Sequence, residues 1–579
     1  MKNTRPGILS VRAVNQYRRR DVLTYLALRY YLHNSAARQD EWAKHVATDL
    51  VLTRTNQPYY GAQHFKEANG NGGVEHRPIF LPGANEALAE AALLDECAKH
   101  PDAFANPQCV FSYELSDRED RSGIFKHYFI GLRERHNAIS MACDSFPNGV
   151  VRYTDIKKYY PSIGKDLAIR VWQKQSEIAG LASYYRELGE KLITDHAVSG
   201  EPGESSILTG PMFSHLIGNL VLRELDEDFC NNLPVKYFRY VDDIILVGNN
   251  AEVNTALNTV RQRLSGLGFI LHGSASLKSF EVPTSKWLLG RHDFNPSPQP
   301  ISWMTLVGDL KRYLLIDRGN RDELVSAFRN EGLRIPVRDY SGAVHESGYL
   351  EKILKWAPHS WFRKKTQLIS VQSLVSQALS LRKSYNESFT KAIENASELN
   401  GFARKRRIPQ LRYYASRLIY LATDDTLLSL FPIADELSEL HFHAKVMEAV
   451  STGNINRLLT LGTNAAQAAA QPIRAAGKAV NLTSIDLPEA EQQALAIFLL
   501  NGVSVERSSG LQEVESEILK FSSTGVDLAL MKSSDPFIRE LSCLHGVSAE
   551  PRHSIMLDKV FDEDEMLAMD AIDQLQQSY

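Results

Sequence analysis

Two adjacent carboxylates, Asp242 and Asp243, interrupt the apolar stretch "FRYVDDIILVG" at residues 238–248. The runs around them, "KYFRY" and "IILVG", are rich in aromatic and β-branched residues, which predicts two short strands joined by a tight corner. Aspartates are common in turns, so a solvated corner is one interpretation. Hairpin corners usually contain Gly or Asn, however, and two crowded anions are unfavourable unless a cation lies on them. The pattern therefore favours a metal site.

A third carboxylate lies upstream, where Asp155 ends the predicted strand in "VVRYTDIKKYYPSI" (150–163). Carboxylates from separate elements can hold two metal ions about 3.5–4 Å apart, an arrangement that promotes in-line phosphoryl transfer. Mg²⁺ needs only a few protein carboxylates when substrate phosphates complete its shell. Asp155 and Asp242 are therefore predicted to bind two Mg²⁺ ions, for which Mn²⁺ can substitute, with Asp243 beside them.

Three further segments complete a series. Between the carboxylates, "SSILTGPMFSHLIGNLVLRELDEDF" (205–229) predicts a Gly-Pro turn that leads into a helix. Downstream, "GLGFILHGSASLKSFEV" contains Lys278, and "KWLLGRHDF" contains a Leu-Leu-Gly turn. In this order and spacing the segments resemble palm motifs A to E of reverse transcriptases, over about residues 75–295.

The resemblance implies a role for each matching residue. Asp155, Asp242 and Asp243 would form the metal site, and Lys278 would be the general acid for the pyrophosphate leaving group. The Tyr160 ring would exclude a ribose 2′-hydroxyl, so the substrates would be dNTPs. Further substrate contacts would come from Lys158, Gly210, Ser214, Asn219, Tyr240, Arg77 and Arg133. For the lysines and arginines, surface positions and structural salt bridges are the alternatives.

The chain departs from the retroviral and intron enzymes in two respects. Its motif B reads Leu208-Thr209-Gly210 and Ser214-His215 where those enzymes have roughly Pro-Gln-Gly and Ser-Pro. No RNase H signature or maturase zinc-binding tail follows. In these respects the chain is similar to the bacterial abortive-infection and defence-associated reverse transcriptases, the AbiK-like and P2-prophage Abi-like group. That likeness implies phage defence, a homo-oligomer (trimer or hexamer), and untemplated, protein-primed synthesis of single-stranded DNA.

Protein priming would need a hydroxyl group, and the candidates are Tyr579, Tyr413 and Tyr414. Basic runs at 18–20, 363–365 and 404–407 fit nucleic acid, because phosphate contacts need cations and base stacking needs nearby aromatic rings. Solvated helix faces are the alternative for such runs. Two other functions stay open: an RNA-templated, retron- or intron-like enzyme with a dedicated noncoding RNA, and an idle palm that acts as a nucleic-acid-binding scaffold.

The elements that must position these residues alternate between strand and helix from residue 108 to 290, with "CVFSYEL" as a further predicted strand. After about residue 300 strand signals end and apolar residues recur at helical spacing. The expected fold is α+β: a reverse-transcriptase-like fingers and palm domain at 1–300, then an all-helical, repeat-like domain at 301–579 that replaces the thumb. Residues 1–70 look helical at first and then break in a Gly/Asn-rich loop.

The composition restricts the class of protein and its compartment. The chain has 579 residues, 44% of them hydrophobic and 23% charged, with a formal net charge of −4. These proportions are typical of a globular protein. Its five cysteines lie far apart without zinc-ligand spacing, which fits a reducing compartment. No run approaches the roughly 20 apolar residues that a membrane helix needs, and no signal peptide is recognisable. We therefore expect a cytoplasmic protein without a membrane partner.

Overall fold

The computed structural model describes most of the chain. The described residues are 7–17, 22–32, 36–55, 59–68, 73–116, 123–200, 205–273, 276, 278–291, 302–316, 321–337, 369–394, 396–399, 401–483, 487–507 and 531–544.

The sheet that carries the three aspartates has four antiparallel strands in the order β4-β5-β3-β6. The strands are β3 (Val150–Asp155), β4 (Lys236–Tyr240), β5 (Asp243–Gly248) and β6 (Phe280–Pro283). In their register Asp155 lies opposite Asp243, and Asp243 lies opposite Tyr240. The strands predicted at "VVRYTDI", "KYFRY", "IILVG" and "FEV" are thus confirmed, and the carboxylates meet at one end of the sheet.

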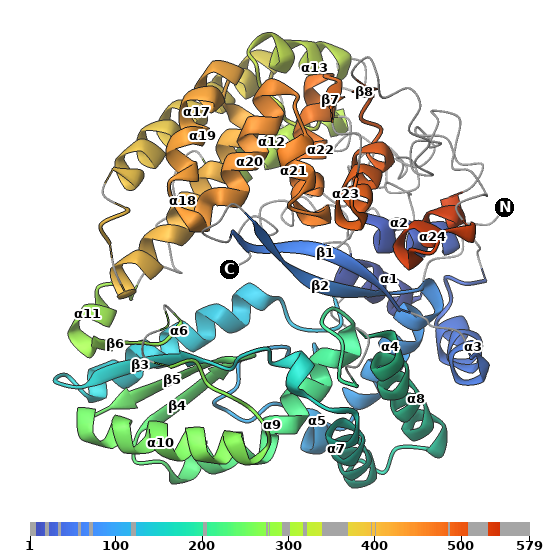
Figure 1. The fold of residues 1–579 in the computed structure, drawn as a ribbon, viewed down its shortest axis with the longest axis vertical. Coiled ribbons are helices and arrows are strands. Elements are labelled where there is room, and N and C mark those ends of the chain that lie inside the picture. The colour runs from blue at the N-terminus through green and yellow to red at the C-terminus, as the bar shows by residue number, and fades with distance from the viewer. Residues whose placement is uncertain are drawn as a thin grey trace.

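Both faces of this sheet are covered, as the uniformly apolar sequence of β5 requires. Ile244 and Leu246 belong to the core shared with α9 (Met212–Asn232) and α10 (Asn250–Gly266). Ile245 and Val247 belong to the core under α6 (Tyr128–Ser145) and α11 (Thr284–Leu288). Successive side chains of a strand point to opposite faces, so Asp155 and Asp243 share the α6 side. Figure 1 shows α10 below the sheet.

The N-terminal helices pack beside this unit. They are α1 (Ile8–Tyr17), α2 (Val22–Tyr31), η1 (Trp42–Ala47), α3 (Thr48–Thr53), α4 (Ala84–Cys97), α5 (Pro101–Phe104), α7 (Lys165–Ile178) and α8 (Ser183–Ser199). Helix α4 is almost completely buried, and it contacts α1, α3 and α9. Its run of alanines and leucines suits this position, because small side chains allow helices to approach closely on several sides.

The C-terminal region is mainly helical. Its longer helices are α12 (Trp303–Ile316), α13 (Arg321–Asn330), α17 (Val371–Ile393), α18 (Gly401–Leu421), α19 (Asp424–Asp435), α20 (His441–Thr452), α22 (Thr463–Ala476) and α23 (Glu489–Leu500). The shorter α21 (Asn456–Leu459) and α24 (Pro536–Glu540) complete it. The molecule is therefore mixed α+β with a helical C-terminal region. The expectation of an all-helical region was wrong in one detail, since β7 (Val480–Leu482) and β8 (Val505–Arg507) form a short parallel pair.

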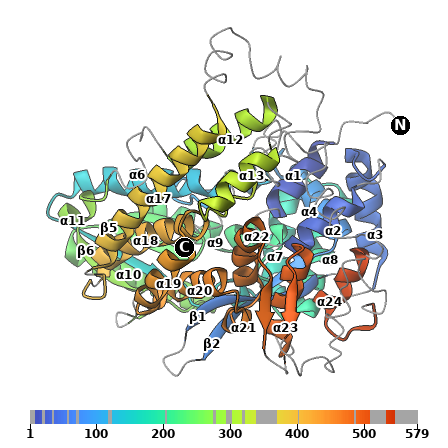
Figure 2. The same cartoon turned by 90° about the horizontal axis from the view of Figure 1, so that it is seen from above.

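A long hairpin joins the two halves of the molecule. Strands β1 (Tyr59–Ala68) and β2 (Val74–Pro82) form a two-stranded sheet, and their side chains Tyr60, Ala62 and Leu81 belong to the core of the helical region. The backbone N–H of Phe65 donates to Asn464 Oδ1 at 3.0 Å. Figure 1 shows the hairpin crossing between the upper helices and the lower sheet, and Figure 2 shows it from above.

Two predicted secondary structures were wrong. Residues 59–68 form a strand where helix followed by loop was expected, because Tyr59, Tyr60 and Ala62 are buried against other elements. Residues 109–115 form no strand but make two isolated bridges, Val110 to Arg239 and Leu115 to Phe125. Between these bridges the chain turns through Tyr113, whose φ of 47° is incompatible with an extended strand.

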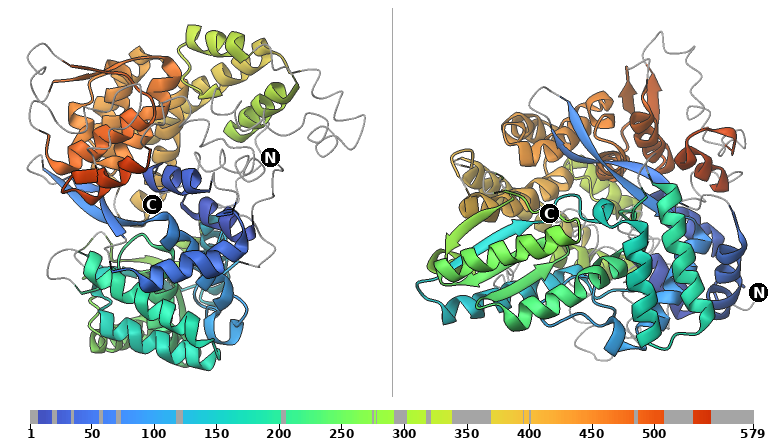
Figure 3. Two further views of the ribbon diagram at one scale, coloured as in Figure 1. Left: turned by 90° about the vertical axis from the view of Figure 1, so that its right-hand side faces the viewer. Right: turned by 60° about the horizontal axis from the view of Figure 1, so that its bottom comes forward.

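The described helices include none with the length and apolar character needed to cross a membrane. Figure 3 gives two further views of the same arrangement, in which the sheet and the helical region lie on opposite sides of the hairpin.

Candidate metal centre

The three aspartates predicted from sequence converge in space. One carboxylate oxygen from each of Asp155, Asp242 and Asp243 lies within 4.8 Å of the others. Asp155 is 5% exposed, and its Oδ1 is a buried oxygen without a hydrogen-bond partner among the described residues. An orphaned buried carboxylate oxygen is costly unless a cation or proton satisfies it. The oxygen-only donor set is the kind that Mg²⁺ and Mn²⁺ prefer, so the residues fit a divalent metal.

Electrostatic crowding is visible at Asp242. Burial, followed by the charges of Asp243 and Asp155, raises the pKa of Asp242 to about 7. The metal-free site thus holds a proton near neutral pH. A divalent cation in contact with the three carboxylates would favour the ionised form and displace that proton.

Two side chains outside the predicted set support Asp243. The Tyr153 hydroxyl donates a hydrogen bond to Asp243 Oδ1, and burial, with the Asp243 charge, raises the pKa of Tyr153 so that it stays protonated. Arg135 Nη1 lies 3.5 Å from Asp243 Oδ2 and stacks over the Tyr240 ring at 5.1 Å. Asp243 is therefore oriented from two sides.

Lys278 is brought to the centre as predicted from sequence. Its Nζ lies 3.0 Å from Asp155 Oδ2, although its side chain is half exposed. His272 Nε2 lies 4.0 Å from the same oxygen, and burial lowers its pKa. A lysine in this position can balance the carboxylate charge and can deliver a proton to a leaving group beside the metal site.

The corner that carries Asp242 and Asp243 is strained. Val241 has a φ of 56°, which is an outlier for a β-branched residue. Two hydrogen bonds hold it: its N–H donates to Ser112 Oγ at 2.9 Å, and its carbonyl accepts from Arg239 Nη1 at 2.7 Å. The other described non-glycine residues with positive φ are Tyr113, which follows Ser112, and Lys158, on the turn after Asp155. Such strain persists where the surroundings over-determine the backbone.

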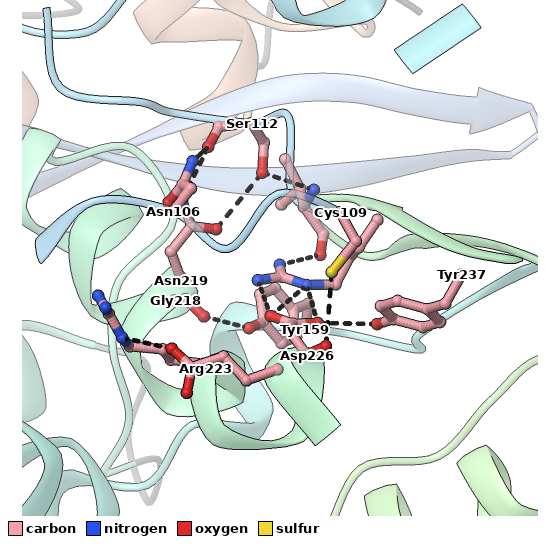
Figure 4. A network of polar contacts seen from close by, with 12 residues as sticks. Asn106, Cys109, Ser112, Tyr159, Gly218, Asn219, Arg223, Asp226 and Tyr237 are labelled. Carbon is pink, nitrogen blue, oxygen red and sulfur yellow. Dashed lines mark hydrogen bonds and ion pairs between the residues drawn. The ribbon is translucent and has the colours of Figure 1, made fainter. Parts of the chain in front are cut away.

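Figure 4 shows the polar network behind this corner. The Asn219 amide donates to the Ser112 carbonyl at 2.8 Å, while Ser112 Oγ donates to Asn219 Oδ1 at 3.4 Å. Arg239 forms a bidentate pair with Asp226, with donor–acceptor distances of 2.6 to 3.0 Å, and both side chains are fully buried. Asn219, predicted to lie near the nascent base pair, thus acts on the site through Ser112 and the strained corner.

Tyr160 is held in one orientation. Its hydroxyl lies 2.6 Å from His215 Nδ1, and the His215 ring stacks on Tyr113 with centroids 3.7 Å apart. Its ring also lies against Gly218, where an added Cβ would approach Tyr160 to 3.2 Å. His215 therefore fixes the ring of Tyr160. The retroviral and intron enzymes have Pro at the position of His215.

The loop before α9 contacts the hairpin. The N–H of Phe80 donates to the Thr209 carbonyl at 2.8 Å. Gly210 has a φ of 132°, and a Cβ there would meet the Phe80 carbonyl oxygen. Ser214 is fully buried inside the start of α9. Gly210 is therefore required for close approach of the backbone to β2, and both residues are buried.

The remaining predicted contacts differ in placement. Tyr240 lies beside the centre under Arg135, with its hydroxyl 3.3 Å from the Tyr128 carbonyl. Lys158 is exposed on the turn after Asp155. Arg77 is exposed on β2 and Arg133 is exposed on α6. Arg135 lies two residues after Arg133 on α6, and it is Arg135 that reaches the carboxylate of Asp243.

The priming candidates in α18 are half-buried. The Tyr413 hydroxyl lies 3.2 Å from that of Tyr385, and Tyr414 packs edge-on against Tyr413 with centroids 5.5 Å apart. Tyr579 and the basic runs 18–20 and 363–365 lie outside the described residues.

Lys405 of α18 was not expected at this centre. Its Nζ lies 3.1 Å from the centroid of the Tyr153 ring and 5.2 Å from that of Phe280. The side chain is exposed to solvent, yet the protein around the ammonium group lowers its pKa to about 8, with Asp243 opposing the change. Lys405 therefore lies over the aromatic rings of β3 and β6, on the same face of the sheet as Asp155 and Asp243.

A sequence signal existed for some of the missed residues. Tyr153 precedes Asp155 by two positions, so strand periodicity places both on one face. Arg239, a cation inside an apolar strand, indicated a buried partner. Nothing in the local sequence points from Arg135, Ser112 or Lys405 to the carboxylates, because each reaches them by tertiary packing.

Comparison with known proteins adds no assignment: no protein-family model matches the chain, and a search of curated proteins finds no similar sequence.

Proposed function

We propose that this chain is a reverse-transcriptase-type DNA polymerase that transfers nucleotidyl groups from dNTPs at Asp155, Asp242 and Asp243. The observation that carries the proposal is the convergence of these carboxylates at adjoining strand ends, with Lys278 on Asp155. In the reaction a hydroxyl oxygen attacks the α-phosphate, a new P–O bond forms, and the bond to pyrophosphate breaks.

Each residue has a defined task in this proposal. Asp155 and Asp242, with Asp243, would hold two Mg²⁺ ions, which when bound stabilise the charge of the transferring phosphate. Lys278 gives a proton to the leaving pyrophosphate oxygen. Tyr160, held by His215, limits the space at the sugar 2′ position. The exposed Lys158 offers a charge to the triphosphate.

The resemblance to the defence-associated group also leads us to propose a role in phage defence. The helical C-terminal region after the sheet supports this assignment, as does the altered loop at Gly210, which packs on β2. Protein-primed synthesis, a homo-oligomer and relaxed use of template belong to the same proposal.

The test uses the full-length protein with Mg²⁺ and four labelled dNTPs, without template or primer. We compare the wild type with Asp242→Asn and with Asp166→Asn, a matched exposed aspartate on α7. We expect labelled DNA from the wild type and Asp166→Asn, and at least a 100-fold loss in Asp242→Asn, as for removal of an essential charge-stabilising group.

Digestion then separates the alternatives. A protease-sensitive product supports protein priming. Product formed only after an RNA is supplied, or a discrete RNA that co-purifies, would replace the proposal with a templated enzyme. Absence of turnover under both conditions would leave the nucleic-acid-binding scaffold.

A further inference from the structure

Helix α18 connects the helical region to the edge of the catalytic sheet. The Phe402 ring stacks on Trp287 of α11, with centroids 4.8 Å apart and an interplanar angle of 21°. Arg406 Nη2 donates to the Leu289 carbonyl at 3.1 Å. Figure 1 shows the start of α18 reaching down to α11. The first turns of α18 are therefore fixed relative to the carboxylates.

The basic run at the start of α18 is not a uniform charged surface. Arg404 forms a bidentate pair with Glu439, at 2.6 and 2.7 Å. Arg406 donates a hydrogen bond to the backbone carbonyl of Leu289. Lys405 instead points to the sheet, where it lies over Tyr153 and Phe280, and among the described residues no carboxylate lies within 4.0 Å of its ammonium. Part of the side chain is exposed, and the ammonium has aromatic faces as its partners and no carboxylate among these residues.

Lys405, Lys278 and Lys158 lie at different positions along the direction of β3. Tyr153 precedes Asp155, and Tyr153 pairs with Phe280, so Lys405 lies on the sheet side of the carboxylates. Lys278 is level with Asp155, and Lys158 lies beyond it. In-line transfer places the attacking strand and the leaving pyrophosphate on opposite sides of the reacting phosphate.

We infer that Lys405 binds a backbone phosphate of the growing DNA strand, as the contribution of the helical region to the active centre. The inference deepens the proposed function and rests on it, because that function places the triphosphate at Lys158 and Lys278 and leaves the Lys405 side for the strand. The stacked rings of Tyr153 and Phe280, 5.0 Å apart, hold the ammonium in place through their π-faces.

The experiment measures strand binding without turnover. Full-length protein is titrated with a fluorescein-labelled, mixed-sequence single-stranded oligodeoxynucleotide, without dNTPs, at several salt concentrations. We compare Lys405→Gln and Lys405→Arg with Lys391→Gln, an exposed lysine of α17 as the matched control. The KM for dNTPs is measured separately at saturating strand.

We expect Lys405→Gln to weaken binding roughly fivefold and to reduce the salt slope by about 0.7, the value for one lost phosphate contact on a single strand. Lys405→Arg should restore both values, because arginine retains the charge, and Lys391→Gln should match the wild type. The dNTP KM should change less than about twofold. A merely structural role for Lys405 would not alter the salt slope.

Three results would overturn the inference: no strand binding by the wild type, unchanged affinity and slope in Lys405→Gln, or a raised dNTP KM with normal strand binding, which would make Lys405 a triphosphate contact. The proposed polymerase can fail separately. Loss of strand binding in Lys405→Gln, in a protein whose wild type turns over no dNTP, would support the strand site and refute the enzyme.

Discussion

At the scale of single residues, Asp242 sets the proton balance of the metal site. Its pKa of about 7 in the folded, metal-free protein lies above the ordinary aspartate value because of burial and the charges of Asp243 and Asp155. The folded state therefore binds a proton that the unfolded state releases. This group stabilises the metal-free fold fully at pH values below the ordinary pKa, and that stability is lost as pH rises through about 7.

Metal binding should depend on pH in the opposite direction to the stability of the metal-free fold: the affinity for the metal should increase as pH rises. Below pH 7 the proton on Asp242 must leave first, so the apparent affinity for Mg²⁺ or Mn²⁺ should fall about tenfold per pH unit, with about one proton released per binding event. Calorimetry in two buffers of different ionisation enthalpy measures both quantities. Asp166→Asn should behave as the wild type, and an affinity constant between pH 5.5 and 7.5 would contradict the assignment.

Tyr153 provides a second prediction at this scale. Tyr153→Phe removes the hydroxyl that donates to Asp243 but keeps the ring beneath Lys405. Residues that orient a metal ligand typically contribute 10–100-fold to affinity or activity, so we expect metal affinity or turnover to fall by about tenfold or more. Tyr385→Phe, which removes a hydroxyl in the helical region, is the control. Equal effects of the two substitutions would show that Tyr153 acts only on stability.

At the scale of elements, the β4–β5 corner depends on the loop at residues 106–116. Val241 remains at positive φ because Ser112 and Arg239 satisfy its N–H and carbonyl, and Asn219 of α9 in turn fixes Ser112. The corner is therefore supported from an irregular loop and a helix as well as by its own strands.

Ser112→Ala tests this support. The substitution leaves the N–H of the strained Val241 without its acceptor, which should lower the free energy of unfolding by about 1–3 kcal/mol. Turnover should fall as well, because the aspartates at the corner lose their fixed position. Chemical denaturation and the dNTP assay measure the two effects. Ser326→Ala, which removes an exposed hydroxyl from α13, should change neither; normal turnover in Ser112→Ala would contradict the role of the loop.

At the scale of the whole molecule, the β1–β2 hairpin makes the two halves interdependent. Gln493 of α23 accepts from the Gln63 N–H at 3.2 Å and donates to the Gly61 carbonyl at 3.2 Å. On its other side, the Phe80 N–H donates to the Thr209 carbonyl before α9. The hairpin therefore contacts both halves of the molecule, and with the contact of α18 on α11 it would be disturbed by a movement of the helical region against the sheet.

Gly462 provides the test of this connection. It has a φ of 87°, and a Cβ there would meet the Gln63 carbonyl oxygen of the hairpin, whereas Gly268 has a φ of 88° with open space around it. Gly268→Ala should therefore cost only the backbone strain of about 1–2 kcal/mol. Gly462→Ala should cost clearly more and should lower DNA synthesis. Equal thermal shifts for the two variants would refute a tight contact between the hairpin and α22.

Local sequence pattern was enough to predict one part of the site. The strands around the aspartates follow from their aromatic and β-branched residues. The sequence predicted Asp155 and Asp242 as metal ligands with Asp243 beside them, and the register of β3 and β5 in the structure places Asp155 opposite Asp243. The helical character after residue 300 was also legible.

The distant side chains that complete the centre are selected by tertiary packing. Arg135 and not Arg133 reaches Asp243 because the packing of α6 on the sheet selects one helical face. Lys405 reaches Tyr153 from 252 positions further along the chain because α18 packs on α11. Contacts across such separations depend on the docking of whole elements, and local propensity carries no information about that docking.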